Sequence, residues 1–164
     1  MALQNELMAK RNHFLTMQSQ PKNQIFLKQC KTSEIFSKPI EILTYKELEM
    51  EYYRVFLPFS NEISYFNLVP GFIFTQSTFF NEQTNPSLIF LVNPTIVPEG
   101  FHPQHLAEGT YLSILVEDNY EKAPYYYNML RQHMWKQKMD VLGDIYEFCY
   151  SVLTHITNNL SLLV

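Results

Sequence analysis

Glu147 is the residue best suited to chemistry, because its carboxylate interrupts a stretch, residues 143–152, that otherwise has the composition of a strand. Side chains alternate along a strand, so Glu147 shares one face with Ile145 and Cys149. The opposite face carries Tyr146, Phe148, Tyr150 and Val152, and we expect it to be core. Two interpretations of Glu147 are open. Either it is an exposed glutamate on a half-solvated strand, or it lies in apolar walls, where desolvation makes it seek a cation or a hydrogen-bond donor.

Other patterns that could do chemistry are weaker. His102 and His105 occur in a proline-bearing stretch that we expect to be a loop, and two histidines without a third ligand are more typical of a surface than of a metal site. The chain has only 4 glycines and no glycine-rich phosphate loop. The acidic run Glu47, Glu49, Glu51 has the pattern of a solvated helix face. We therefore expect no metal and no cofactor.

Composition indicates one soluble globular domain. The chain has 164 residues, 13 Phe and 11 Tyr, and a formal charge of -4 without a Lys/Arg cluster, which argues against a nucleic-acid surface of its own. Cys30 and Cys149 lack the paired spacing of zinc or redox sites, which favours a reduced intracellular setting. No apolar run has the length of a membrane span, and the N-terminus does not read as a signal peptide. These features predict a cytoplasmic protein.

The N-terminal stretch from Ala2 to Gln18 reads as a polar helix with a sparse apolar stripe. The seven-residue spacing from Leu7 to Phe14 suits the end of a coiled segment, although a local amphipathic helix explains the pattern equally well. We therefore divide the chain into an N-terminal helix or linker, residues 1–22, and a main domain, residues 23–164.

The main domain reads as two copies of one β-α-β-β unit, covering approximately residues 30–95 and 106–164. Expected strands are residues 34–40, 71–76, 87–92, 110–116, 144–152 and 160–164, and expected helices are residues 45–57 and 121–139. The sequence spacing from Gly71 to Gly143 equals the spacing from Tyr53 to Tyr125, which is the offset between the two copies. At that offset Glu147 corresponds to a threonine in the first copy, so the carboxylate is present once. The prediction is an α+β fold with pseudo-twofold symmetry, in which helices pack on an antiparallel sheet.

With these stretches in view, residues 24 to 164 resemble the effector-binding domains of BmrR-like MerR-family regulators and the gyrase-inhibitor-like small-molecule-binding superfamily. The resemblance lies in the sequence Glu108-Gly109-Thr110-Tyr111, in the helix that follows, and in Gly143-Asp144-Ile145-Tyr146-Glu147. It implies that Glu147 is the acidic residue at the base of an aromatic pocket for lipophilic cations. It further implies that Cys149 lines this pocket, with Tyr53 and Leu48 contributed by the first helix.

Two more residues complete the candidate ligand-binding set: Tyr111, which opens the second repeat, and Tyr125, the counterpart of Tyr53 in the second helix. The family's pattern is not complete. Its pocket tyrosine on the last strand aligns near Leu160, and two aromatics near the second helix align with Asp118 and Ala123.

The resemblance also bears on partners. In the regulators a long coiled helix joins a DNA-binding winged-helix module to this domain, and residues 2–18 look like the end of that helix. DNA binding would then need a separate module absent from these residues, and dimerisation in a full regulator would use the N-terminal helix.

Three function classes follow. The first is a ligand-sensing domain of a bacterial transcription regulator, and the second is a stand-alone small-molecule-binding protein. The third is an enzyme, because some relatives in this superfamily resemble hydrolases that use the same carboxylate; Glu147 would then act as general base or nucleophile, with Tyr111 as a candidate proton carrier. Binding is preferred over catalysis.

Overall fold

A computed structural model describes residues 8, 19–41, 44–59, 68–82, 85–94, 96–118, 122–152 and 155–163. The strands form one antiparallel sheet in the order β1-β6-β8-β7-β3-β4-β2-β5. The strands are β1 (Ile25–Cys30), β2 (Ser33–Pro39), β3 (Val69–Phe74), β4 (Leu88–Val92), β5 (His102–Leu106), β6 (Gly109–Glu117), β7 (Ile145–Val152) and β8 (His155–Leu163). The helices are α2 (Tyr45–Phe56), α3 (Gln76–Phe80), α4 (Ala123–Gln137) and the short 3-10 turn η1 (Leu57–Phe59).

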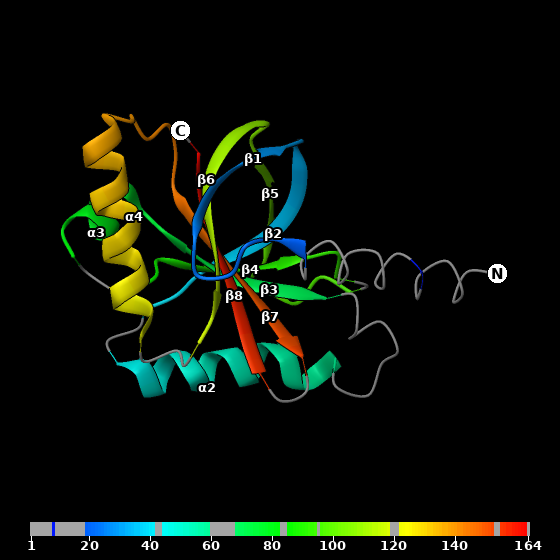
Figure 1. The fold of residues 1–164 in the computed structure, drawn as a ribbon. Coiled ribbons are helices and arrows are strands. Elements are labelled where there is room, and N and C mark those ends of the chain that lie inside the picture. Colours follow the sequence, from blue (N-terminus) through cyan, green and yellow to red (C-terminus); the bar gives the residue numbers. More distant parts are fainter. Residues whose placement is uncertain are drawn as a thin grey trace.

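The helices pack on the sheet, so the predicted α+β arrangement is confirmed. In Figure 1, α2 runs along the bottom of the view, and α4 stands upright at the left with α3 beside it. A capping box begins α2: the Thr44 hydroxyl accepts from the Glu47 backbone N–H, and the Glu47 carboxylate accepts from the Thr44 N–H. Glu47 is thus part of a helix cap and not simply one of a row of solvated carboxylates.

Apolar side chains cover both faces of the sheet. The larger core cluster lies between the sheet and the helices, and combines strand residues such as Phe74 and Ile145 with helix residues such as Leu130. The smaller cluster lies on the opposite face and comprises Ile35, Ile73, Phe90 and Leu106, with Leu88, Val92, Tyr146 and Phe148 packed against it. Alternate side chains along the strands therefore enter two different apolar cores, one on each face of the sheet, and neither face is simply solvent-exposed.

Gly71 in β3 permits the close packing of the second core. A Cβ atom at this position would overlap the Phe90 ring and the Glu147 backbone carbonyl. Gly71 pairs with Phe148 of β7 and with Phe90 of β4. The absence of a side chain lets an aromatic ring lie over the backbone at the junction of the two central strands.

The strand expected over residues 160–164 begins earlier, at His155, and the short helix α3 was not predicted. Three further differences separate the predicted elements from the described ones. The stretch around His102 and His105 is the edge strand β5 and not a loop; edge strands tolerate the proline within it. The segment Ile25–Cys30 is also a strand, β1, which the sequence analysis did not predict. The strand expected over residues 71–76 ends at Phe74, because Thr75 caps α3, its hydroxyl accepting from the Thr78 N–H at 3.2 Å.

The N-terminal helix predicted over residues 2–18 falls outside the described residues apart from Met8, and the division at residue 22 stays a prediction. Among the helices described, none has both the length and the apolar character needed to cross a membrane.

Candidate functional site

Glu147 lies at the centre of the sheet and is completely buried, with 0 % of its surface exposed. It pairs with Phe72 of β3 on one side and with Leu160 of β8 on the other. Its side chain is on the face covered by the helices, together with Ile145 and Cys149, which are also buried. The interpretation as an exposed glutamate is wrong. The bulky face with Tyr146 and Phe148, expected to be the core, is the less buried of the two faces at β7.

Tyr127 of α4 donates its hydroxyl hydrogen to Glu147 Oε2 at 2.8 Å, and both residues are buried. The Tyr127 ring stacks edge-on against Phe74 of β3 and Phe79 of α3, with centroid separations of 5.5 and 5.8 Å. Arg131, one turn further along α4, donates to the Phe79 carbonyl at 2.8 Å and lies over the Phe79 ring. The tyrosine that contacts the carboxylate therefore belongs to a cluster of aromatic side chains from β3, α3 and α4.

The electrostatic environment at Glu147 disfavours further negative charge. Burial raises the pKa of the Cys149 thiol well above its ordinary value, and the nearby Glu147 carboxylate raises it further. Cys149 is consequently a neutral, unreactive thiol at ordinary pH. A buried carboxylate loses its hydration, and hydrogen bonds such as that from Tyr127 offset part of this cost.

A second tyrosine of α4 is held by the end of β6. Tyr126 is buried, and its hydroxyl donates to Asp118 Oδ2 at 2.8 Å. Desolvation, followed by the hydrogen bond and charge of Asp118, raises the pKa of Tyr126 to about 12. Lys122 forms an ion pair with the other oxygen of Asp118 at 3.0 Å. The first turn of α4 is thus tied to β6, and this fixes the helix that carries Tyr127.

The predicted site residues are not all brought together. Cys149 and Leu48 are buried in the same core cluster as the surroundings of Glu147. Tyr53 on α2 and Tyr125 on α4 are 59 % and 62 % exposed, so their rings face outward from helices whose inner faces contact the core. As ligand contacts they stay predictions, and the structure places neither beside the buried carboxylate.

Tyr111 lies on the opposite face of the sheet from Glu147, as strand pairing through β8 requires. Its hydroxyl donates to the Ala107 carbonyl at 2.9 Å, and burial, with smaller effects from Tyr146 and Cys30, raises its pKa to about 12. Tyr111 is therefore separated by the sheet from the carboxylate to which it was expected to deliver a proton.

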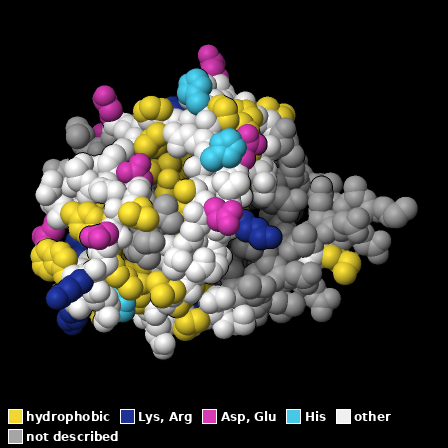
Figure 2. Space-filling view, turned by 90° about the horizontal axis from the view of Figure 1, so that it is seen from above, with side chains coloured by type: hydrophobic (Ala, Val, Ile, Leu, Met, Phe, Trp, Pro, Cys, Tyr) yellow, Lys and Arg dark blue, Asp and Glu magenta, His cyan; other side chains and the backbone are white. Residues whose placement is uncertain are grey.

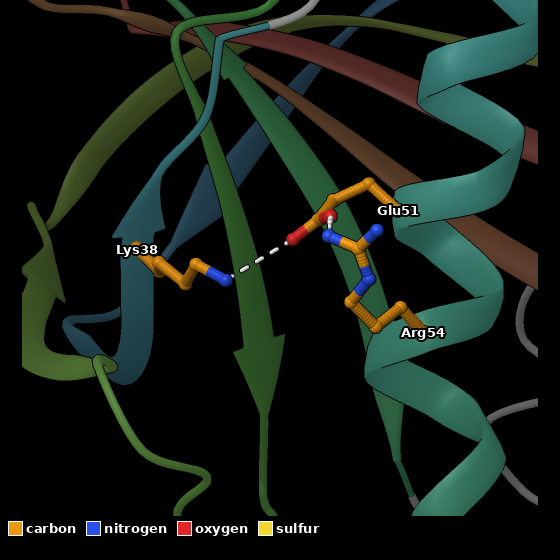
Figure 3. A network of polar contacts seen from close by, with 3 residues as sticks. All are labelled: Lys38, Glu51 and Arg54. Atoms are coloured by element: carbon orange, nitrogen blue, oxygen red, sulfur yellow. Dashed lines mark hydrogen bonds and ion pairs between the residues drawn. The ribbon is translucent and has the colours of Figure 1, made fainter.

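An ion-pair network fixes α2, which carries Leu48, against β2. Glu51 accepts from Lys38 Nζ at 3.1 Å and from Arg54 at 2.8 Å, and its side chain is only 13 % exposed (Figure 3). Glu51 was expected on a solvated face; it instead bridges helix and strand. A groove of about 350 Å³ adjoins this network and is lined by Lys38, Pro39, Ile40, Glu41, Glu47, Met50, Glu51 and Arg54.

The surface shows single charges and not a charged cluster on the face drawn in Figure 2, where acidic, basic and histidine side chains stand among hydrophobic ones. His102 and His105 project from opposite faces of β5, because they are three positions apart on a strand. Within the residues that the structure describes, no three His, Cys, Asp or Glu side chains form a group able to hold a metal ion.

Sequence reasoning missed Tyr127, Phe79 and the Tyr126–Asp118 pair. Tyr127 carries a usable signal, because it precedes Leu130 and Met134 at helical spacing and all three are buried. Phe79 belongs to a five-residue helix whose only signal is the Thr75 cap.

With this geometry established, the chain can be compared with known proteins. Neither a protein-family model nor a curated protein matches the sequence. Solved structures do match. The crystal structure of the EcmrR C-terminal domain superposes with a TM-score of 0.62 at 11 % identity, covering 85 % of this chain and 96 % of that one. EcmrR in a cryo-EM complex with DNA gives a TM-score of 0.63 at 14 % identity, covering 94 % of this chain and 63 % of that one.

A hydrolase from Listeria innocua is similar over 92 % of this chain and 96 % of its own length, with a TM-score of 0.51 and 11 % identity. At these identities the likeness concerns the fold. The fold is similar to that of the EcmrR C-terminal domain and to that of a protein named as a hydrolase, so the fold alone does not separate binding from catalysis.

Proposed function

We propose that this chain is the ligand-sensing, effector-binding domain of a bacterial transcription regulator, and that it binds lipophilic cations at Glu147. The observation that carries the proposal is the complete burial of Glu147 among aromatic side chains, with a tyrosine hydroxyl directed at it. A carboxylate in such a place costs stability, and residues of this kind are typical of functional sites.

The physical basis is recognition by shape and charge. A delocalised organic cation gains about 25 cal/mol for each Å² of apolar surface that it buries, and aromatic rings add a cation–π attraction of about 0.5–2 kcal/mol. Glu147 supplies the selection for charge, since a bound cation offsets the cost of the buried carboxylate. Phe74, Phe79 and Tyr127 supply the aromatic surroundings.

The likeness to the EcmrR C-terminal domain supports a sensing role. The larger EcmrR chain is seen in complex with DNA, and our chain spans 63 % of its length. In the proposed regulator a separate winged-helix module contacts DNA, and the N-terminal helix forms a dimer. The ligand acts by binding one conformation of the regulator better than another.

The test is a fluorescence titration with a rhodamine-type cationic dye against the wild type and Glu147→Gln. The substitution removes the charge and nearly preserves the shape, and we expect at least roughly a tenfold loss of affinity, the size typical of losing one charge-assisted contact. Glu34→Gln, which neutralises an exposed carboxylate on β2, is the matched control and leaves affinity unchanged. Equal affinities of wild type and Glu147→Gln for the cationic dye would refute the proposal.

A hydrolase is the second candidate, favoured by the 2.8 Å hydrogen bond between Tyr127 and Glu147. A carboxylate and a phenol in contact could serve as base and proton donor toward an electrophilic small molecule. Turnover of such a substrate, abolished by Glu147→Gln and by Tyr127→Phe, would favour this candidate over simple binding.

We also propose that the two β-α-β-β units are related by a pseudo-twofold axis between β3 and β7. The strand order supports it, because β3-β4-β2 and β7-β8-β6 list corresponding strands outward from the centre of the sheet. Gly71 is inside β3, whereas Gly143 precedes β7. Superposition of residues 30–95 on residues 106–164 tests the axis, which fails if these glycines do not come near one another.

A further inference from the structure

Lys22 and Asn23, which precede β1, contact the C-terminal end of β6. Lys22 forms a parallel bridge with Leu115 and an ion pair with Glu117. Asn23 has a left-handed backbone with φ of 56°, a conformation that asparagine tolerates. Its N–H donates to the Leu115 carbonyl at 2.7 Å, and its side-chain oxygen accepts from the Glu117 N–H at 3.2 Å. Four contacts thus converge on the last three residues of β6.

The next residue, Asp118, binds a different element. It accepts from the Tyr126 hydroxyl of α4 and pairs with Lys122 just before that helix. Tyr126 is adjacent to Tyr127, whose hydroxyl donates to Glu147. Glu117 therefore contacts the N-terminal segment, and the next residue, Asp118, contacts α4, the helix of the candidate site.

We propose that Glu117 and Asp118 form a joint that couples the docking of Lys22 and Asn23 to the position of α4, and through α4 to binding at Glu147. This regulatory role rests on the function proposed above. The joint lies where the N-terminal helix would continue from a DNA-binding module. A ligand that shifts α4 would change the hold of Asp118 on Tyr126, and thereby the end of β6 to which Asn23 is bonded.

The coupling must be reciprocal, because linkage between two sites acts equally in both directions. If a ligand strengthens the joint by some factor, then loosening the joint weakens the ligand by the same factor. The structure offers two amides that report on the joint directly: the Asn23 N–H and the Glu117 N–H, each donating across it.

Residue-resolved hydrogen exchange of these two amides in the whole chain is the first test. Tyr126→Phe removes the hydroxyl bound by Asp118, and we expect exchange of both amides to become at least roughly tenfold faster, as the loss of one hydrogen bond to a charged group predicts. The matched control is Tyr111→Phe, which removes a buried hydroxyl bonded to Ala107 on the opposite face of the sheet. Equal exchange in wild type and Tyr126→Phe, or equal acceleration in both variants, overturns the joint.

A rhodamine-type cation then tests the link to the site. Asn23→Gly keeps a residue suited to the left-handed backbone and removes the side-chain acceptor. We expect dye binding to change exchange of the Asn23 and Glu117 amides in the wild type. If the dye slows their exchange, Asn23→Gly should bind the dye more weakly than wild type; if the dye speeds their exchange, Asn23→Gly should bind it more tightly. A dye that binds without altering either amide overturns the proposed regulation. If no dye binds while Tyr126→Phe loosens the joint, the ligand-sensing function and the proposed regulation both fail. The structural coupling of α4 to Lys22 and Asn23 then stands.

Discussion

The two central strands, β3 and β7, lie side by side and contribute to the same layer beneath the helices, yet they present different chemistry there. β3 contributes Phe72 and Phe74, whereas β7 contributes Ile145, Glu147 and Cys149. The two strands also differ in where they end. β3 stops at Phe74, after which Thr75 caps α3, whereas β7 continues to Val152. In the repeat proposed above Thr75 corresponds to Glu147, so the same position would cap a helix in the first unit and carry a buried carboxylate in the second. We therefore expect substitutions in β3 to affect mainly the stability of the protein, and substitution of Glu147 in β7 to affect mainly ligand affinity.

The largest expected effect is on the β3 side. Phe74→Ala removes a fully buried ring that contacts Tyr127, and should lower the free energy of unfolding by about 3–5 kcal/mol. Urea denaturation measures the loss. A change below about 1 kcal/mol would mean that β3 is not the structural half of the pair.

Gly71→Ala should follow in size. The new methyl group must displace the Phe90 ring and the Glu147 carbonyl, and overpacking of this kind costs about 1–3 kcal/mol or more. Combining it with Phe90→Leu should recover the part due to the ring and leave the part due to the backbone. A double-mutant cycle in denaturant separates the two contributions.

Hydroxyl deletions compare the two faces of the sheet. Tyr127→Phe breaks a bond to a carboxylate, and we expect a loss of about 1.5–3 kcal/mol, against about 1 kcal/mol for Tyr111→Phe, which breaks a bond to a backbone carbonyl. Thermal or chemical unfolding of both variants provides the comparison. The reverse order would show that Glu147 does not strengthen its contact with Tyr127.

The smallest effect on stability is expected for Glu147→Gln, although it should have the largest effect on ligand affinity. Removing a buried charge while keeping an acceptor for Tyr127 leaves the free energy of unfolding within about 1 kcal/mol of wild type, or raises it. Denaturation of ligand-free protein is the measurement. A large loss of stability would make Glu147 a structural residue and would remove the contrast between β7 and β3.

The sequence was sufficient to find β7 and its carboxylate, because a single glutamate within a strand-forming run is unusual and alternation places Cys149 on the same face. Leu48, which the family resemblance implied, is buried in the same core cluster as Cys149. Contact of either residue with a ligand stays a prediction. Tyr111 was misplaced relative to Glu147 because residues 111–116 of β6 are all buried, so its alternation does not distinguish one face from the other. Tyr127 was missed because it belongs to three consecutive tyrosines, of which Tyr126 is also buried. Its helical spacing to Leu130 and Met134 indicates a buried position but does not identify the tyrosine that contacts Glu147.

The strands β1 and β5 were missed for a different reason. Each is a short edge strand, and exposed side chains make up half of β1 and all but one residue of β5. β1 pairs with β6, and β5 pairs with β2. Their pairing depends on the distant strands β6 and β2, and a local sequence pattern carries little information about such partners.

The position of β8 has a consequence for how the chain folds. β8 lies between β6 and β7, so the pair β1-β6 is separated from the five strands β7-β3-β4-β2-β5 until β8 is inserted. Among the described strands, β8 also comes last in chain order. During synthesis the sheet therefore stays in two pieces until residues 155–163 have left the ribosome, and folding is dominated by late, long-range pairing. Both exposed edges that receive β8 are at risk of pairing with other chains during that interval, and Glu147 is enclosed only when it ends.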